Sequence, residues 1–176
     1  MPFYDQYVEE LLSAEQVQER VKALGAQITR DYEGKDLVVV GIMKGSIFFL
    51  TDLARAIDLP VTLELMGVSS YQGGTDTTGE VRITHDLTKP MHGRHVLLVE
   101  DIIDTGLTMK FLLENLSARR PTSIKVATLL EKPARAKVKV PIDYKGFVIE
   151  DRFVVGYGLD HAEQFRQLPF IGELSI

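Results

Sequence analysis

Residues 96–108 constrain the fold of this chain more than any other stretch. They begin with the apolar run Val96–Val99, continue through the acidic pair Glu100-Asp101 and turn at Asp104-Thr105-Gly106. An unbroken apolar run is typical of a central strand in a parallel sheet, because neighbouring layers cover both of its faces. The stretch therefore predicts, in order, a buried strand, a tight turn and the start of a helix.

The polar half of this stretch predicts a ligand site. Open α/β sheets bind their ligands at the carboxyl ends of the strands, where Glu100 and Asp101 are expected. Two adjacent carboxylates can accept hydrogen bonds from the two hydroxyls of a ribose. The turn from Asp104 to Thr108 offers backbone N–H groups to a phosphate at a helix start. The pattern thus indicates a ribose phosphate, and its alternative is an ordinary strand-to-helix turn with acidic surface residues.

Strands and helices are expected to alternate along the rest of the chain. Ser13 and Gln16 form a capping box that opens a helix through Ile28, and Pro60 and Pro121 end two later helices. The expected strands cover residues 37–42, 61–68, 81–84, 96–101, 124–130 and 153–157, and the later helices lie near residues 47–57 and 112–116. Alternation without repeats or linkers predicts one α/β domain over residues 1–176, with a mainly parallel sheet flanked by helices.

Composition excludes several classes of function. The formal net charge of -5 argues against general binding to nucleic acid or to anionic membranes. The chain has no cysteine, which rules out disulfides, cysteine nucleophiles and thiolate metal sites, and its four histidines show no metal-binding pattern. The sequence shows no secretory signal and no apolar run long enough to cross a membrane, so a cytoplasmic protein is expected.

Other polar residues are expected at the ends of strands. Lys44-Gly45 follows the first strand, where glycine lets the backbone approach a phosphate beside the lysine ammonium. Residues 69–79 are polar and glycine-rich, which predicts a mobile loop. Lys132 is a donor without acceptor capacity, which favours a ligand that presents an oxygen over one that presents an amino group. Judged by spacing alone, however, Lys132 is better explained as a surface lysine and Phe153 as a core aromatic.

The stretch from Glu100 to Thr108 resembles the phosphoribosyl-diphosphate-binding motif of the type I phosphoribosyltransferases, and most closely that of their hypoxanthine-guanine members. The order of the family's motifs holds from Val38 to Arg166. The resemblance implies a type I phosphoribosyltransferase fold with a small hood region and a mobile loop.

The resemblance also implies roles for individual residues. It makes Asp104 the acid–base residue near purine N7. The ribose and its phosphate would be held by Glu100, Asp101, Thr105, Gly106, Leu107 and Thr108. The pyrophosphate would meet Lys44, Gly45 and Arg166, under a lid that carries Ser70 and Tyr71. The purine would be bound by Lys132, Phe153, Val154 and Asp160, and magnesium by Glu100, Asp101 and Asp160.

The implied reaction is magnesium-dependent transfer of the 5-phosphoribosyl group from phosphoribosyl diphosphate to N9 of hypoxanthine or guanine. Its products are IMP or GMP and pyrophosphate, and the family implies a homodimer or homotetramer. Two alternatives stay open: a transferase that prefers xanthine or guanine, and a regulator that senses phosphoribosyl diphosphate without catalysis. A phosphoribosyl diphosphate synthetase is disfavoured, because the chain is too short for a duplicated domain and an ATP site.

Two positions depart from the family pattern, and a third matches it weakly. Leu107 stands where some relatives carry a basic residue, which removes one phosphate contact. Gly158 replaces an alanine of some members, and this change is expected to matter little. Arg135 lies in a region of poorer match and is only a weak candidate for a basic contact.

Overall fold

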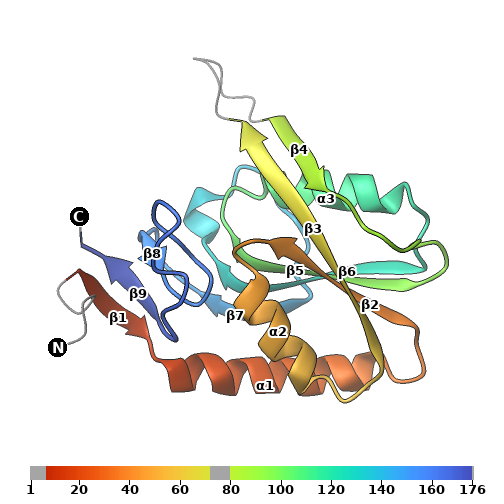
Figure 1. The fold of residues 1–176 in the computed structure, drawn as a ribbon, viewed down its shortest axis with the longest axis horizontal. Coiled ribbons are helices and arrows are strands. Elements are labelled where there is room, and N and C mark those ends of the chain that lie inside the picture. Colours follow the sequence, from red (N-terminus) through yellow and green to blue (C-terminus); the bar gives the residue numbers. More distant parts are fainter. Residues whose placement is uncertain (1–6, 72–79, 176) are drawn as a thin grey trace.

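The computed structural model describes residues 7–71 and 80–175 and is built around a six-stranded sheet (Figure 1). The strand order is β4-β3-β2-β5-β6-β7. The strands are β2 (Leu37–Met43), β3 (Val61–Tyr71), β4 (Glu80–His85), β5 (His95–Ile103), β6 (Ser123–Glu131) and β7 (Tyr144–Val148). Neighbours pair in parallel from β3 to β7, and β4 pairs antiparallel with β3 at the edge. The predicted mainly parallel sheet is therefore confirmed.

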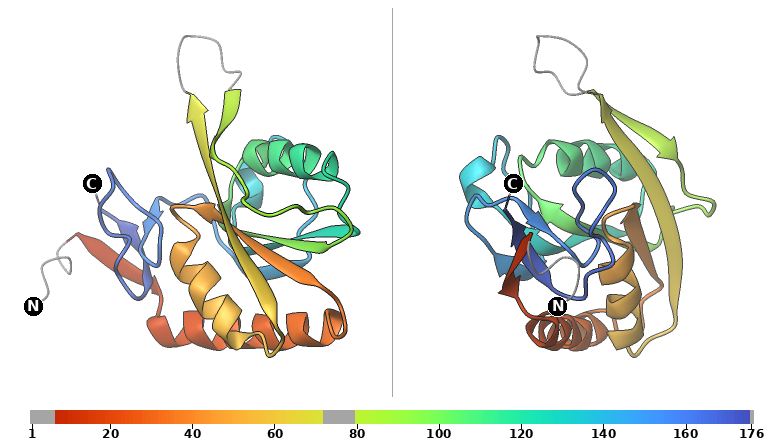
Figure 2. Two further views of the ribbon diagram at one scale, coloured as in Figure 1. Left: turned by 45° about the vertical axis from the view of Figure 1, so that its right-hand side comes forward. Right: turned by 60° about the vertical axis from the view of Figure 1, so that its left-hand side comes forward.

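Helices cover both faces of this sheet, as the two turned views of Figure 2 show. Helices α1 (Ala14–Asp31) and α2 (Ile47–Ala56) pack on one face, and α3 (Leu107–Ser117) packs on the other. Strand β2 serves both cores, because Val39 points towards α1 and α2 while Val38 and Val40 point towards α3. The three-layer arrangement leaves the carboxyl ends of the central strands free to form a site.

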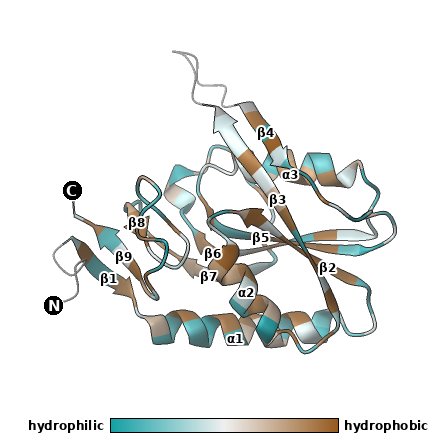
Figure 3. Cartoon of the chain, viewed as in Figure 1, coloured by the Kyte–Doolittle hydropathy of each residue, from teal (hydrophilic) through white to brown (hydrophobic). Residues whose placement is uncertain are grey.

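Helix α1 begins where the sequence predicts. The Gln16 backbone N–H donates to Ser13 Oγ at 3.2 Å, and the Ser13 N–H donates to Gln16 Oε1 at 2.8 Å, which completes the capping box. Figure 3 shows the apolar colouring of the central strands and the mixed colouring of α1, whose inner side is buried. Within the described residues, none of the helices combines the length and the apolarity that crossing a bilayer requires.

A second, smaller sheet joins the two ends of the chain. It consists of β1 (Val8–Leu12), β9 (Ile171–Leu174) and β8 (Val154–Val155), all paired antiparallel. The sequence pattern did not predict β1 or β9, because strands of four or five residues whose partners are far away in sequence carry little periodicity. This sheet supports the segment that follows β8, which forms one wall of the site.

Two predicted boundaries are wrong. The loop expected from Ser69 begins later, because Ser69 to Tyr71 pair with Arg82 to Glu80 and extend β3. Residues 72–79, the rest of that predicted loop, lie outside the described residues. The strand expected over 153–157 is reduced to β8, because Gly156 and Tyr157 have positive φ angles and turn the chain away.

A short helical turn, η1 (Pro133–Arg135), follows β6.

Candidate active site

A pocket of about 310 Å³ opens at the carboxyl ends of the central strands. Residues from the end of β2, the end of β5, the start of α3 and the segment after β8 line it. It brings together these predicted site residues: Gly45, Glu100, Asp101, Asp104, Thr105, Gly106, Thr108, Asp160 and Arg166. The predicted convergence of strand ends on one edge of the sheet thus occurs.

The turn between β5 and α3 forms the phosphate side of the pocket. Gly106 has a φ of 82°, and a Cβ on it would lie 2.5 Å from the Val138 carbonyl oxygen, so both the backbone angle and the close approach favour glycine. Helix α3 has no side-chain cap and no acidic residue in its first turn. A helix start of this kind favours an anion such as a phosphate.

Glu100 and Asp101 form a crowded acidic pair on the floor of the pocket, both half-buried. Burial raises the pKa of the Glu100 carboxyl well above its ordinary value, and the neighbouring Asp101 charge raises it further. Burial likewise raises the pKa of Asp101, against the Ile102 backbone N–H that donates to its Oδ1 at 2.9 Å. The pair therefore favours a cation or several hydroxyl donors as its partner.

Gly45 and Gly158 allow the two sides of the pocket to meet. A Cβ on Gly45 would lie 1.9 Å from Asp101 Oδ2, so the loop after β2 rests directly on the acidic pair. Gly158 has a φ of 103°, and a Cβ there would lie 1.9 Å from the Gly45 carbonyl oxygen. The expectation that residue 158 matters little is therefore at odds with this packing. The peptide bond that enters the loop, between Met43 and Lys44, is cis.

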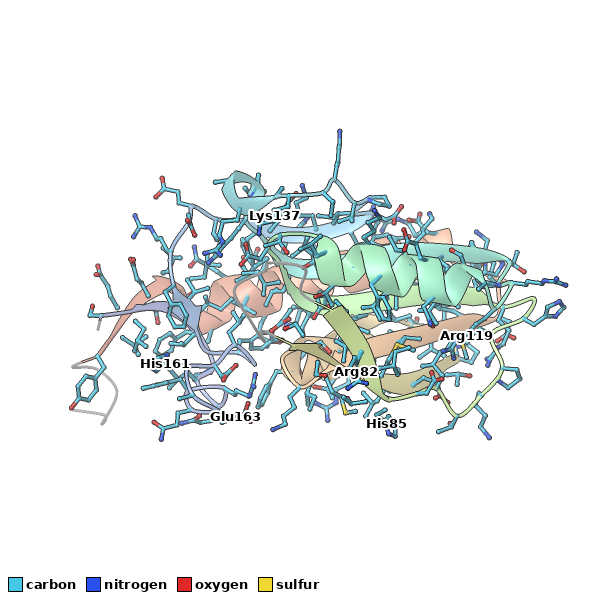
Figure 4. The ribbon with its side chains drawn as sticks, turned by 90° about the horizontal axis from the view of Figure 1, so that it is seen from above. Arg82, His85, Arg119, Lys137, His161 and Glu163 are labelled. Carbon is cyan, nitrogen blue, oxygen red and sulfur yellow. The ribbon has the colours of Figure 1, made fainter. Side chains whose placement is uncertain are left out.

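Lys44 and Arg166 meet through an acidic residue that the sequence did not single out. Lys44 Nζ lies 2.5 Å from Glu163 Oε2, and Arg166 Nη2 lies 2.9 Å from Glu163 Oε1. Arg166 also pairs with Asp160 at 3.0 Å and donates to the Gly158 carbonyl oxygen at 2.7 Å. Figure 4 shows Glu163 and His161 on the same looped segment. The three-residue spacing between Glu163 and Arg166 is the sequence signal that could have pointed to Glu163.

The predicted purine residues lie beside the pocket. Lys132 is only 7% exposed and its Nζ is 3.9 Å from Asp151 Oδ1, so it is not a surface lysine. Lys132 and Asp104 both line a neighbouring cavity of about 540 Å³. Phe153 is 49% exposed and meets His161 edge to face with the ring centroids 5.5 Å apart, so it is not a core aromatic. Val154 is buried in β8.

Asp104 has a basic neighbour that the sequence favoured only weakly. Arg135 Nε on η1 lies 2.9 Å from Asp104 Oδ1, as an ion pair without an aligned hydrogen bond. Arg135 Nη1 also lies 3.6 Å from Asp151 Oδ1. The arrangement holds Asp104 between the phosphate turn and the cavity of Lys132.

The predicted metal ligands do not form a preformed cage. Among the described residues, no three His, Cys, Asp or Glu side chains gather closely enough to hold a metal ion. Asp160 is instead engaged with Arg166. Magnesium is usually bound by one or two carboxylates together with substrate oxygens, and the crowded Glu100-Asp101 pair fits that pattern.

The remaining predicted residues lie outside the pocket lining. Ser70 is exposed on β3, and Tyr71 ends that strand. Leu107 is half-buried at the first position of α3. The lid function predicted for Ser70 and Tyr71 depends on residues 72–79 and stays a prediction.

Comparison with known sequences identifies close relatives. A family model described as the phosphoribosyl transferase domain matches residues 7–162. The hypoxanthine-guanine phosphoribosyltransferase of Staphylococcus aureus (strain Mu50 / ATCC 700699) is 49% identical over 167 residues, which cover 95% of this chain and 93% of that protein. The protein of the same name from Mycobacterium tuberculosis (strain CDC 1551 / Oshkosh) is 49% identical over 171 residues, covering 94% and 85%.

Comparison with solved structures identifies the same family of proteins. A hypoxanthine phosphoribosyltransferase from Staphylococcus aureus superposes with a TM-score of 0.94 at 47% identity, covering 99% of this chain and 95% of that chain. A hypoxanthine phosphoribosyl transferase from Trypanosoma cruzi superposes with a TM-score of 0.93 at 36% identity, with the same coverage.

Proposed function

The chain belongs to the phosphoribosyl transferase family, and we propose that it converts hypoxanthine or guanine and phosphoribosyl diphosphate into IMP or GMP and pyrophosphate with the help of magnesium. Its fold is the type I phosphoribosyltransferase fold, and it is an enzyme of the hypoxanthine phosphoribosyltransferase group. We further propose that residues 1–176 act as a single phosphoribosyltransferase domain.

One observation carries this proposal. The same pocket holds the acidic pair Glu100-Asp101, the uncapped start of α3 and Arg166, and Lys44 is joined to Arg166 through Glu163. An acidic pair suits ribose hydroxyls, a bare helix start suits a 5′-phosphate, and paired cations suit a pyrophosphate. Phosphoribosyl diphosphate contains all three groups, with its ribose between the 5′-phosphate and the pyrophosphate.

The charges of the pocket match the charges that the reaction develops. As N9 attacks carbon 1 of the ribose, the bond to the pyrophosphate oxygen breaks, so positive charge gathers on the ribose and negative charge on the leaving group. Glu100 and Asp101 would hold the ribose hydroxyls, while Lys44 and Arg166 would stabilise the departing pyrophosphate. Magnesium, when bound, adds positive charge at the pyrophosphate. Glu100 and Asp101 are its candidate ligands, and Asp160 becomes available only if Arg166 releases it.

We assign binding of the purine base, and uptake of the proton that it loses, to the side of the site near Lys132. Lys132 would donate to the oxygen at carbon 6, and Phe153 would stack on the purine ring. Asp104 would take up the proton of the purine through N7. Arg135 engages one carboxylate oxygen of Asp104, so it would compete with the purine for this residue.

The test is product formation with phosphoribosyl diphosphate and magnesium, with hypoxanthine, guanine, xanthine and adenine offered separately. Turnover of hypoxanthine and guanine without adenine is the expected result. A strong preference for xanthine would favour the alternative specificity. Binding of phosphoribosyl diphosphate without turnover of any base would favour the regulatory alternative.

We also propose that the protein assembles as a homodimer or homotetramer in the cytoplasm. Leu63 and Leu65 are 49% and 38% exposed on β3, opposite Val39 and Gly41 of β2, and so lie on the sheet face that α2 covers only in part. Ile47 and Phe48 of α2 are exposed as well. Exposed apolar side chains gathered in this way are typical of an interface between proteins. Light scattering after gel filtration will measure the number of copies.

A further inference from the structure

Glu163 lies between the two cations of the pyrophosphate side and engages both. Its Oε2 lies 2.5 Å from Lys44 Nζ, and its Oε1 lies 2.9 Å from Arg166 Nη2. Each carboxylate oxygen thus faces a different cation. Two oxygens of a phosphate group bind two cations in the same way. The carboxylate therefore stands where an anionic ligand would make its contacts.

The backbone around Glu163 directs it to this place. Ala162 and Glu163 have φ angles of 50° and 66°, a region that residues other than glycine seldom adopt. The Glu163 N–H donates to Asp160 Oδ2 at 2.8 Å, and His161 and Gln164 bridge across the turn. Unfavourable backbone angles that persist in a tight, hydrogen-bonded turn often serve a functional purpose.

Electrostatics keeps Glu163 charged in the ligand-free protein. Hydrogen bonds from Lys44 and Arg166 lower the pKa of its carboxyl, so it is ionised at neutral pH. Arg166 also pairs with Asp160, whereas Glu163 contacts both Lys44 and Arg166. The same carboxylate repels an incoming pyrophosphate and competes with it for the same donors.

We propose that Glu163 is an internal counterion that occupies the pyrophosphate-binding cations until the ligand displaces it. This inference rests on the proposed function, which assigns Lys44 and Arg166 to the pyrophosphate. Glu163 is then a positioning residue, because it acts through the two cations. By returning to them it weakens pyrophosphate binding and favours release of that product.

The test is calorimetric titration of the full chain with inorganic pyrophosphate in the presence of magnesium. Glu163→Gln keeps the shape of the side chain and removes its charge. We expect pyrophosphate to bind roughly three- to tenfold more tightly, because two exposed ion pairs no longer compete with it. Glu163→Asp keeps the charge and should bind within about twofold of the unmodified protein. The inhibition constant of pyrophosphate should shift by the same factor.

Two controls separate competition from a change in overall charge. Glu33→Gln makes the same charge change on an exposed turn between α1 and β2, far from the pocket, and should leave pyrophosphate binding unchanged. Titration with IMP should give equal affinities for Glu163→Gln and the unmodified protein, because its phosphate is assigned to the turn before α3. Melting temperatures will show that each variant is folded.

Several outcomes would overturn the inference. Unchanged or weaker pyrophosphate binding by Glu163→Gln would mean that the carboxylate only holds Lys44 and Arg166 in place. Equal tightening for IMP, or in Glu33→Gln, would mean that only the general field changed. Failure of the proposed function looks different: the unmodified protein would then make no nucleotide from phosphoribosyl diphosphate, whatever the variant does to pyrophosphate binding.

Discussion

The two walls of the pocket are built in contrasting ways. The phosphate wall, residues 100–108, belongs to β5 and α3, and β5 lies between β2 and β6 in the middle of the sheet. The cation wall, residues 156–166, contains two isolated bridges and several residues with positive φ angles. It is attached by contacts with distant parts of the chain, such as the 2.5 Å hydrogen bond from Tyr157 Oη to Asp52 and the packing of Gly158 on Gly45.

The two walls also differ in how their charges are balanced. The phosphate wall holds Glu100 and Asp101 side by side, and burial raises the pKa of both carboxyls. On the cation wall, Glu163 and Asp160 already neutralise Arg166. The wall built on the central strand thus keeps an unbalanced charge for the ligand to satisfy, whereas the looped wall carries its own counterions.

The largest expected effect comes from the chemistry of the phosphate wall. Asp104→Asn keeps the size of the side chain and removes its capacity to accept a proton, so turnover should fall by about 10²–10⁴-fold. Binding of phosphoribosyl diphosphate should stay nearly intact, because the turn offers its backbone to the phosphate. Steady-state kinetics and calorimetry will measure the two quantities, and equal losses in both would contradict the role of Asp104.

The next effect concerns the purine side, just before the cation wall. Phe153→Ala should raise the KM for hypoxanthine by roughly 5- to 150-fold, the usual cost of losing a base–aromatic stack. The affinity for phosphoribosyl diphosphate and the melting temperature should hardly change, because the ring is half exposed. A clear fall in melting temperature with an unchanged KM would instead make Phe153 a packing residue.

A smaller effect tests how closely the cation wall packs against the Lys44–Gly45 loop. Gly158→Ala places a Cβ against the Gly45 carbonyl oxygen and should displace the Lys44–Gly45 loop, so we expect phosphoribosyl diphosphate to bind about tenfold more weakly. Gly93→Ala is the matched control, since Gly93 has a φ of 74° with nothing within 4 Å of the added carbon. Both variants should lose stability from the backbone angle. Equal affinity in the two variants would show that the contact with Gly45 is unimportant.

The smallest expected effect is on stability. Because the folded protein raises the pKa of Glu100, it binds a proton there more readily than the unfolded chain does. Stability contributed by this group is therefore lost as pH rises above about 4.5. Glu100→Gln should flatten this decline and raise the melting temperature of the ligand-free protein at pH 8 by about 2–4 °C, while lowering activity.

A pH series of melting curves without magnesium will check this last prediction. Asp58→Asn, an exposed change distant from the pocket, is a suitable control. Parallel curves for Glu100→Gln and the unmodified protein would show that the acidic pair carries no excess charge in the folded state.

The phosphate wall could be predicted from the sequence almost completely. A buried strand, a glycine turn and a helix start follow one another along the chain, so each residue is positioned by its immediate neighbours. The other assignments needed more. Spacing alone favoured Phe153 in the core and Lys132 on the surface, and the structure shows the opposite for both. The family resemblance assigns both residues to the purine, and that assignment stays a prediction.

The α/β class, the parallel central strands and the position of the acidic pair follow from the amino-acid order, because these features depend on hydrophobic periodicity and on short-range turns. The contacts between distant segments became visible only in the folded chain: β1 on β9, Arg135 on Asp104, Gly158 on Gly45, and Glu163 on Lys44. Such contacts join residues whose separation along the chain leaves no local pattern. They form only when the folded sheet brings the loops at its carboxyl edge within reach of one another.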